Sequence, residues 1–183
     1  MRRIEIGATN DPAPRLRLLM RPSHLPLVVA ALLVASAAQA EAADPLRFFE
    51  GRTENIGVAK VMFHTPYRTR TVGQGRIERD GTLTLLQRVE DEGKTPHERR
   101  WQVRKIGPDR YRATMSDAVG PVIIEKVGRS YRFRFRMKGN LGVEQWLDPL
   151  GDGSSAKSVT KVRKFGVIVA TSDAVIRKLS GGL

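Results

Sequence analysis

Tyr131-Arg132-Phe133-Arg134-Phe135-Arg136-Met137-Lys138 is the stretch that decides the fold class of this chain. Apolar and aromatic side chains occupy every second position, and cationic side chains occupy the positions between them. Successive side chains of a β-strand point to opposite faces of its sheet, whereas a helix repeats about every 3.6 residues. The stretch therefore predicts a strand with one buried face and one cationic face in water.

The same alternation recurs elsewhere in the chain. The residues that share one parity are Leu83, Leu85 and Val89; Trp101 and Val103; Tyr111, Ala113 and Met115; and Phe165, Val167 and Val169, with Gln87 on the side of Leu83. No stretch between residues 53 and 164 has a helical period. This pattern predicts an all-β domain whose strands each bury one face.

Turn-forming residues separate the predicted strands at intervals of about nine to sixteen residues. They are Asp80-Gly81, Glu92-Gly93, Gly107-Pro108-Asp109, Gly120-Pro121, Gly128-Arg129, Gly139-Asn140 and Gly151-Asp152-Gly153. We therefore predict a meander of about 8–10 antiparallel strands. Closing such a sheet into an up-and-down barrel removes its unpaired edges, and a β-sandwich is the alternative.

Three shorter segments are less regular. Residues 44–49 are predicted to form a short helix or a turn that plugs one end of the barrel. Residues 172–179 fit either a capped helix or a last strand. Gly73-Gln74-Gly75 lacks the features of a phosphate-binding loop and is predicted to be a bend or bulge within a strand.

The N-terminal region has the pattern of a secretory signal peptide. A short n-region at Met20–His24 precedes the apolar run Leu25–Ala35, and Ala38-Gln39-Ala40 supplies a small-x-small cleavage site. The apolar run is shorter than the roughly 20 residues that a membrane-spanning helix needs. We predict export to the periplasm of a Gram-negative bacterium with cleavage after Ala40, and an uncleaved anchor is the alternative.

The signal peptide divides the chain into three parts. Residues 1–19 are expected to be a mis-assigned start or an extended n-region, residues 20–40 the signal peptide, and residues 41–183 one barrel domain. The mature protein is expected to be a monomer without a transmembrane span.

Charge and cysteine content narrow the classes of partner. The chain has 32 Lys and Arg against 19 Asp and Glu, a net charge of +13, and only five of these cations lie within residues 1–40. The mature part is therefore basic and attracts anionic surfaces. The chain has no cysteine, which excludes disulfides, thiolate metal sites, cysteine nucleophiles and a lipid-modified cysteine at the cleavage site.

Five elements in order give the chain a family resemblance. They are Phe48–Arg52, Gly75–Leu83, Arg99–Val103, Phe135–Leu147 and Lys164–Gly166. Over residues 44–180 the chain resembles the bacterial family catalogued as domain of unknown function 3833. The resemblance implies an exported or lipid-anchored envelope protein of proteobacteria with a lipocalin-like β-barrel. It implies no activity and no catalytic residues, and the missing cysteine separates this chain from the lipid-anchored members.

The predicted barrel interior is the first candidate site. Barrels of about eight strands are either filled by side chains or hold one small ligand. A polar side chain inside such a barrel needs a hydrogen-bond partner, and a ligand is one such partner. We predict a site for a small apolar or amphipathic ligand, with a packed core as the alternative. Its candidate residues are Gln87, Trp101, Phe133, Phe135, Gln145 and Trp146.

The cationic strand face is the second candidate site. Arg132, Arg134, Arg136 and Lys138 are predicted to form one outward row that docks anionic lipid or polysaccharide, or else a solvated wall. Binding of nucleic acid is not expected, because Phe133 and Phe135 point away from these cations and no aromatic surface is left for base stacking.

An enzyme is the third alternative, and the sequence assigns it no residues. His64 and His97 are expected in loops, and neither has a metal-ligand partner at a recognisable spacing. The chain has no nucleophile elbow, phosphate loop or dinucleotide fingerprint. We therefore predict no metal, no cofactor and no catalytic residue, and we favour a binding protein.

Overall fold

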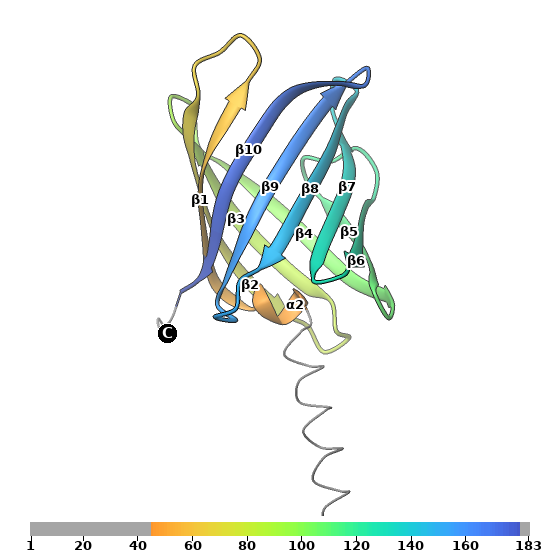
Figure 1. Ribbon diagram of the computed structural model, residues 1–183. Coiled ribbons are helices and arrows are strands. Elements are labelled where there is room, and N and C mark those ends of the chain that lie inside the picture. Colours follow the sequence, from red (N-terminus) through yellow and green to blue (C-terminus); the bar gives the residue numbers. More distant parts are fainter. Residues whose placement is uncertain (1–44, 180–183) are drawn as a thin grey trace, which may run out of the picture. The chain divides into compact units, whose positions relative to one another are not determined.

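Ten antiparallel strands close into a barrel in the computed structural model, which describes residues 45–179 (Figure 1). After the short helix α2 (Pro45–Phe48), the strands are β1 (Gly51–Val61), β2 (Tyr67–Ile77), β3 (Leu83–Asp91), β4 (His97–Gly107), β5 (Arg110–Met115), β6 (Val122–Val127), β7 (Ser130–Met137), β8 (Leu141–Pro149), β9 (Ser155–Lys164) and β10 (Val167–Lys178). Each strand pairs with its sequence neighbours, and β1 pairs with β10. The predicted meander and its closure into a barrel are confirmed, and the sandwich alternative is wrong.

Alternation along the strands separates the barrel interior from the outer wall, as the sequence predicts. In β7, Tyr131 is buried, and Phe133 and Phe135 pack against the core. The core also takes inward residues from β3 to β6, and Leu83 and Val122 are its most deeply buried members. Within residues 45–179, no helix is long and apolar enough to cross a membrane. The predicted signal peptide, residues 20–40, lies outside the described part of the chain.

Helix α2 covers part of one end of the barrel (Figure 1). Leu46 is buried in the core cluster, and Phe48 and Phe49 pack against that cluster. Lys178 Nζ donates a hydrogen bond to the carbonyl oxygen of Arg47 at 3.1 Å, which ties the end of β10 to the helix. The predicted short helix at this end is confirmed, and the predicted last strand is β10.

Two local predictions are wrong. Gly73-Gln74-Gly75 forms no bulge, because β2 keeps an unbroken register with both of its neighbours. These glycines instead leave room inside the barrel, since a Cβ on Gly75 would overlap the carbonyl oxygen of Phe49. The alternating residues 165–169 do not form one strand, because Phe165 and Gly166 make the turn between β9 and β10.

Five loops at the end of the barrel opposite α2 form what we call the rim: residues 62–66, 92–96, 116–121, 138–140 and 165–166. Odd-numbered strands run from the α2 end toward the rim, and even-numbered strands return. Helix α2 covers part of the opposite end, where a pocket lined by Phe48 and Tyr131 remains beside the helix.

The close approach of Phe49 to Gly75 allows a test of whether the end of α2 packs against β2. Gly75→Ala should lower the free energy of unfolding by about 1–3 kcal/mol, because the added methyl group forces the helix end away from β2. Gly151→Ala is the control, since a Cβ there meets nothing within 4 Å. Urea denaturation measures both variants, and equal midpoints would show that α2 does not press on β2.

Candidate functional site

The inner wall of the barrel is bulky on one side and small on the other. Strands β4, β5 and β7 contribute Trp101, Tyr111, Met115, Phe133 and Phe135. Strands β1, β2, β9 and β10 contribute Gly57, Gly73, Ser158, Ala170, Ser172 and Ala174. Side chains this small do not reach across a barrel of ten strands, so the interior is not filled on their side.

Two adjoining cavities lie inside the barrel between the rim and Phe49, and a third, of about 420 Å³, lies at the α2 end against Phe48, Tyr131 and Leu147. The upper cavity has a volume of about 270 Å³ and extends toward the rim, where Val61 and Met137 line it. The lower cavity has a volume of about 90 Å³ and ends at Phe49. The upper and lower cavities are both lined by Asn55, Thr71, Arg99, Trp101 and Gln145, which we call the polar belt.

Two hydrogen bonds hold side chains of the belt in place. Trp101 Nε1 donates to Gln87 Oε1 at 2.9 Å, and Gln145 Nε2 donates to Ser158 Oγ at 2.8 Å. These bonds satisfy polar atoms that burial would otherwise leave unpaired. Asn55 differs, because its Oδ1 is buried without a hydrogen-bond partner among the described residues. The belt therefore holds one acceptor that a ligand group is able to satisfy.

Arg99 is the one charged member of the belt, and it is held by Asp117 in the rim loop 116–121. Arg99 Nε donates to Asp117 Oδ2 at 2.7 Å, and the two side chains are only 25% and 19% exposed. Ser116 Oγ donates to Asp117 Oδ1 at 2.8 Å, and His97 Nε2 lies 3.5 Å from Oδ2. Within residues 45–179, no partner is found for the Arg99 Nη1 and Nη2 atoms, so the outer edge of the guanidinium remains available to a ligand.

Arg99 also keeps Asp117 ionised. Burial alone would raise the pKa of Asp117, but the hydrogen bonds from Arg99 and Ser116 and the positive charge of Arg99 outweigh burial and lower the pKa below its ordinary value. The ion pair fixes the guanidinium in one orientation. Because Asp117 engages Nε, the free edge of Arg99 presents paired donors of the kind that bind a carboxylate, sulfonate or phosphate oxygen.

The structure places five of the six predicted interior residues in the cavity walls. Gln87, Trp101, Phe133 and Gln145 line the lower cavity, and Phe135 lines the upper one. Their role in binding stays a prediction.

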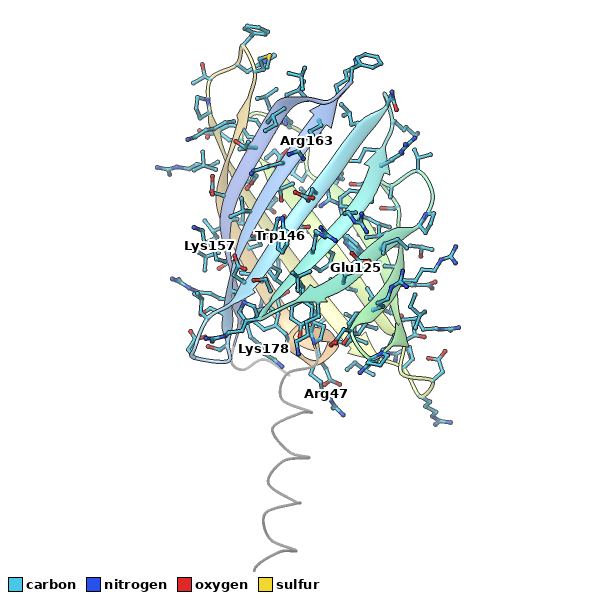
Figure 2. The ribbon with its side chains drawn as sticks, turned by 45° about the vertical axis from the view of Figure 1, so that its right-hand side comes forward. Arg47, Glu125, Trp146, Lys157, Arg163 and Lys178 are labelled. Atoms are coloured by element: carbon cyan, nitrogen blue, oxygen red, sulfur yellow. The ribbon has the colours of Figure 1, made fainter. Side chains whose placement is uncertain are left out.

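Trp146 is the sixth, and the interior position predicted for it is wrong. It follows Gln145 on β8 and so faces outward, where Figure 2 labels it on the barrel wall, and its ring centroid lies 5.7 Å from the guanidinium of Arg132.

The predicted cationic row on β7 faces outward, but part of its charge is neutralised. Arg132 and Arg134 both donate to Glu125 Oε2 on β6, at 2.8 and 3.0 Å. The hydrogen bond from Arg132 is the main reason that the pKa of Glu125 is lowered. Arg136 and Lys138 are exposed farther along the strand toward the rim. The row is therefore less basic than its sequence indicates.

Sequence reasoning missed Arg99 and Asn55. Arg99 shares the parity of Trp101 and Val103, so extending that alternation by one step would have placed an arginine inside the barrel. Asn55 gives no such signal, because β1 mixes small, polar and apolar residues on both faces. Among the residues that the structure describes, no group of three His, Cys, Asp or Glu side chains is placed to hold a metal ion.

A closed meander barrel with a partly open interior defines a lipocalin-like β-barrel protein. The chain belongs to the family described as Protein of unknown function (DUF3833), whose model matches residues 30–178. The family resemblance noted in the sequence is thereby confirmed. A search of curated proteins gives no significant match.

Two solved structures share the fold at low sequence identity. The S-type phycobiliprotein lyase CPES from Guillardia theta has a TM-score of 0.57 and 5% identity, with 75% of this chain and 92% of that chain covered. Rv2717c from M. tuberculosis has a TM-score of 0.56 and 13% identity, with 75% of this chain and 97% of that chain covered. At these identities the likeness concerns the fold alone.

The lowered pKa of Asp117 predicts a pH dependence of stability. A carboxyl group with a lowered pKa stabilises the fold above its ordinary pKa, and this stabilisation is lost as the pH falls through the lowered value. The difference in the free energy of unfolding between the unchanged chain and Asp117→Asn should therefore shrink between about pH 5 and pH 2. Chemical denaturation at several pH values measures this difference. A difference that stays constant over the range would contradict the ion pair.

Proposed function

We propose that the barrel binds one small amphipathic molecule, with its polar group at Arg99 and its apolar part against the aromatic wall. The observation that carries the proposal is the free edge of the Arg99 guanidinium inside a cavity whose wall combines aromatic and aliphatic side chains with polar ones. Such sites combine an apolar lining with a few polar groups that fix the orientation of the ligand.

The contacts of residues in and beside the polar belt favour an amphipathic ligand over a purely apolar one. Trp101 and Phe135 meet edge to face, with ring centroids 6.3 Å apart, and form a rigid apolar surface. Arg99 and Asn55 lie beside this surface and lack partners for some polar atoms. A wholly apolar ligand would cover these atoms without satisfying them, which is unfavourable. An acceptor oxygen on the ligand satisfies the Arg99 N–H groups, and a donor such as a hydroxyl group satisfies Asn55 Oδ1.

The rim is the proposed entrance. The upper cavity reaches Val61 and Met137, whereas the lower cavity ends at Phe49 and α2 covers part of the opposite end. A ligand that enters from the rim meets Arg99 before it reaches the lower cavity, which is too small for more than the tip of a ligand. An anionic group on the ligand is favoured, because a hydrogen bond from Arg99 to a charged acceptor is stronger than one to a neutral acceptor.

The fluorescent probes 1-anilinonaphthalene-8-sulfonate and N-phenyl-1-naphthylamine test this arrangement, because they differ by the sulfonate alone. The barrel should bind the sulfonate probe more tightly. Arg99→Met should weaken binding of the sulfonate probe at least about tenfold, as expected when one charged hydrogen bond is lost, and should leave the neutral probe nearly unchanged. Fluorescence titration gives both dissociation constants.

Arg100→Met is the matched control. Arg100 is the next residue of β4, but its side chain is exposed and pairs with Glu98 on the outer wall. If both arginine variants weakened the sulfonate probe equally, the site would lie outside the barrel. Ser172→Phe, which fills the upper cavity, should abolish binding of both probes. Unchanged binding in that variant would also contradict an interior site.

We also propose that the barrel acts after export to the periplasm. The support is the signal pattern of residues 20–40, which lie outside the described part of the chain. Intact-mass measurement of protein from the periplasmic fraction should give a chain that begins at Glu41, and Ala40→Arg should leave the longer form. Recovery of the uncleaved chain from the cytoplasm would contradict export.

A further inference from the structure

The rim exposes two phenylalanines on neighbouring hairpins. Phe63 in the β1–β2 loop is 97% exposed, and Phe165 in the β9–β10 turn is 81% exposed. Strands β1 and β10 are paired up to Val61 and Ala170, and Met62 N donates to the Val169 carbonyl at 2.9 Å. Both hairpins therefore extend from paired strands at the end opposite α2, where their tips stand apart from each other (Figure 1). Met62, Val167 and Ile168 beside them are also exposed.

The backbone at both positions is unfavourable for phenylalanine. Phe63 has φ 64° and Phe165 has φ 51°, which is the left-handed region that glycine and asparagine adopt more readily. Turns at both ends of the barrel place glycine at other positions of this kind, as at Gly81, Gly93 and Gly128. A bulky aromatic side chain that is both strained and exposed does not stabilise this fold. Its presence at the tips of two neighbouring hairpins indicates a role outside the folded chain.

Exposed lysines lie at the same end of the barrel as these two tips. Lys60, Lys138 and Lys164 are exposed on the rim or directly below it, and Lys164 Nζ lies 5.9 Å from the ring centroid of Phe165. Farther down the same wall lie Arg163 and Lys157, on the outward side of β9 (Figure 2). A surface that combines aromatic tips with lysines matches the two layers of an anionic bilayer, its acyl chains and its headgroups.

Two of the three acidic groups described at this end are paired with cations, and only Glu92, whose hydrogen-bond partner is a neutral backbone amide, keeps its negative charge unneutralised. Asp91 pairs with Lys94 at 3.2 Å, and Asp117 pairs with Arg99 at 2.7 Å. Glu92 Oε2 accepts a hydrogen bond from the Arg68 backbone N at 2.9 Å. Glu92 lies next to the β1–β2 hairpin, because β2 pairs with β3 and Glu92 is hydrogen-bonded to Arg68 of β2. Asp117 belongs to the β5–β6 loop, which does not adjoin either phenylalanine-bearing hairpin.

We propose that the rim docks on an anionic lipid bilayer by inserting Phe63 and Phe165 among the lipids, which turns the open end of the barrel toward the membrane. This surface shares Lys138 with the β7 row but does not include Arg132 and Arg134, which are engaged by Glu125. The proposal does not depend on what the cavity binds. It adds a route by which a molecule from the bilayer reaches the interior without crossing water.

The absence of cysteine allows a position-specific test in the full chain. Phe63→Cys and Phe165→Cys each provide one site for an environment-sensitive nitrobenzoxadiazole label. With vesicles of phosphatidylglycerol and phosphatidylcholine, the emission of both labels should shift to the blue and rise several-fold. Ile106→Cys is the matched control, because Ile106 is an exposed apolar residue at the α2 end. Its label should not respond.

A double variant tests the energetic role of the two rings. Phe63→Asn and Phe165→Asn together should reduce vesicle partition at least about tenfold, as expected from lost apolar burial. The double variant should fold as stably as the unchanged chain, since asparagine accepts left-handed backbone, and a thermal melt checks this. Ile106→Asn should leave partition unchanged.

Three results would overturn the proposal. In the first, the labels at 63 and 165 stay in water while the chain binds vesicles, so another part of the chain makes the contact. In the second, vesicles of phosphatidylcholine alone bind equally well at every salt concentration, so the lysines take no part. In the third, the double variant converts an oligomer into a monomer without changing vesicle partition, so the rim packs against a second copy.

Discussion

The pairing of β1 with β10 is the constraint on which the rest of the structure depends. It joins the first and last strands over nine residue pairs, from Thr53 with Lys178 to Val61 with Ala170, and leaves no edge strand in the barrel. Gly57 makes this closure possible, because a Cβ there would overlap the backbone and side chain of Ala174. Closure also places the two phenylalanine-bearing hairpins on paired strands.

Closure alone does not explain the cavity, which depends on how side-chain volume is distributed around the wall. Bulky residues on β4, β5 and β7 fill their half, whereas glycine, alanine and serine on β1, β2, β9 and β10 leave theirs unfilled. The polar belt lies where the two halves meet. The strands that close the barrel therefore carry small inward side chains. These small residues allow the strands to pair closely, and they also leave the space of the cavity.

Alternation in the sequence predicted the meander, the closure and the inward side of β7, because a strand buries one parity and exposes the other. The prediction failed where residue type was followed instead of parity. Trp146 is large and aromatic but faces outward, and Arg99 is charged but faces inward, so residue type misled in both cases. The partner of Arg99 lies in the loop 116–121, and a contact across 18 positions cannot be deduced from local pattern.

The most direct test of the account is a crystal structure of the full chain with decanoate, a linear amphiphile with one carboxylate. The account predicts decanoate inside the barrel, its carboxylate within hydrogen-bond distance of the Arg99 Nη atoms and its alkyl chain against Trp101 and Phe133. Decanoate bound only on the outer wall would contradict the account. Decanoate inside the barrel with its carboxylate away from Arg99 would contradict it equally.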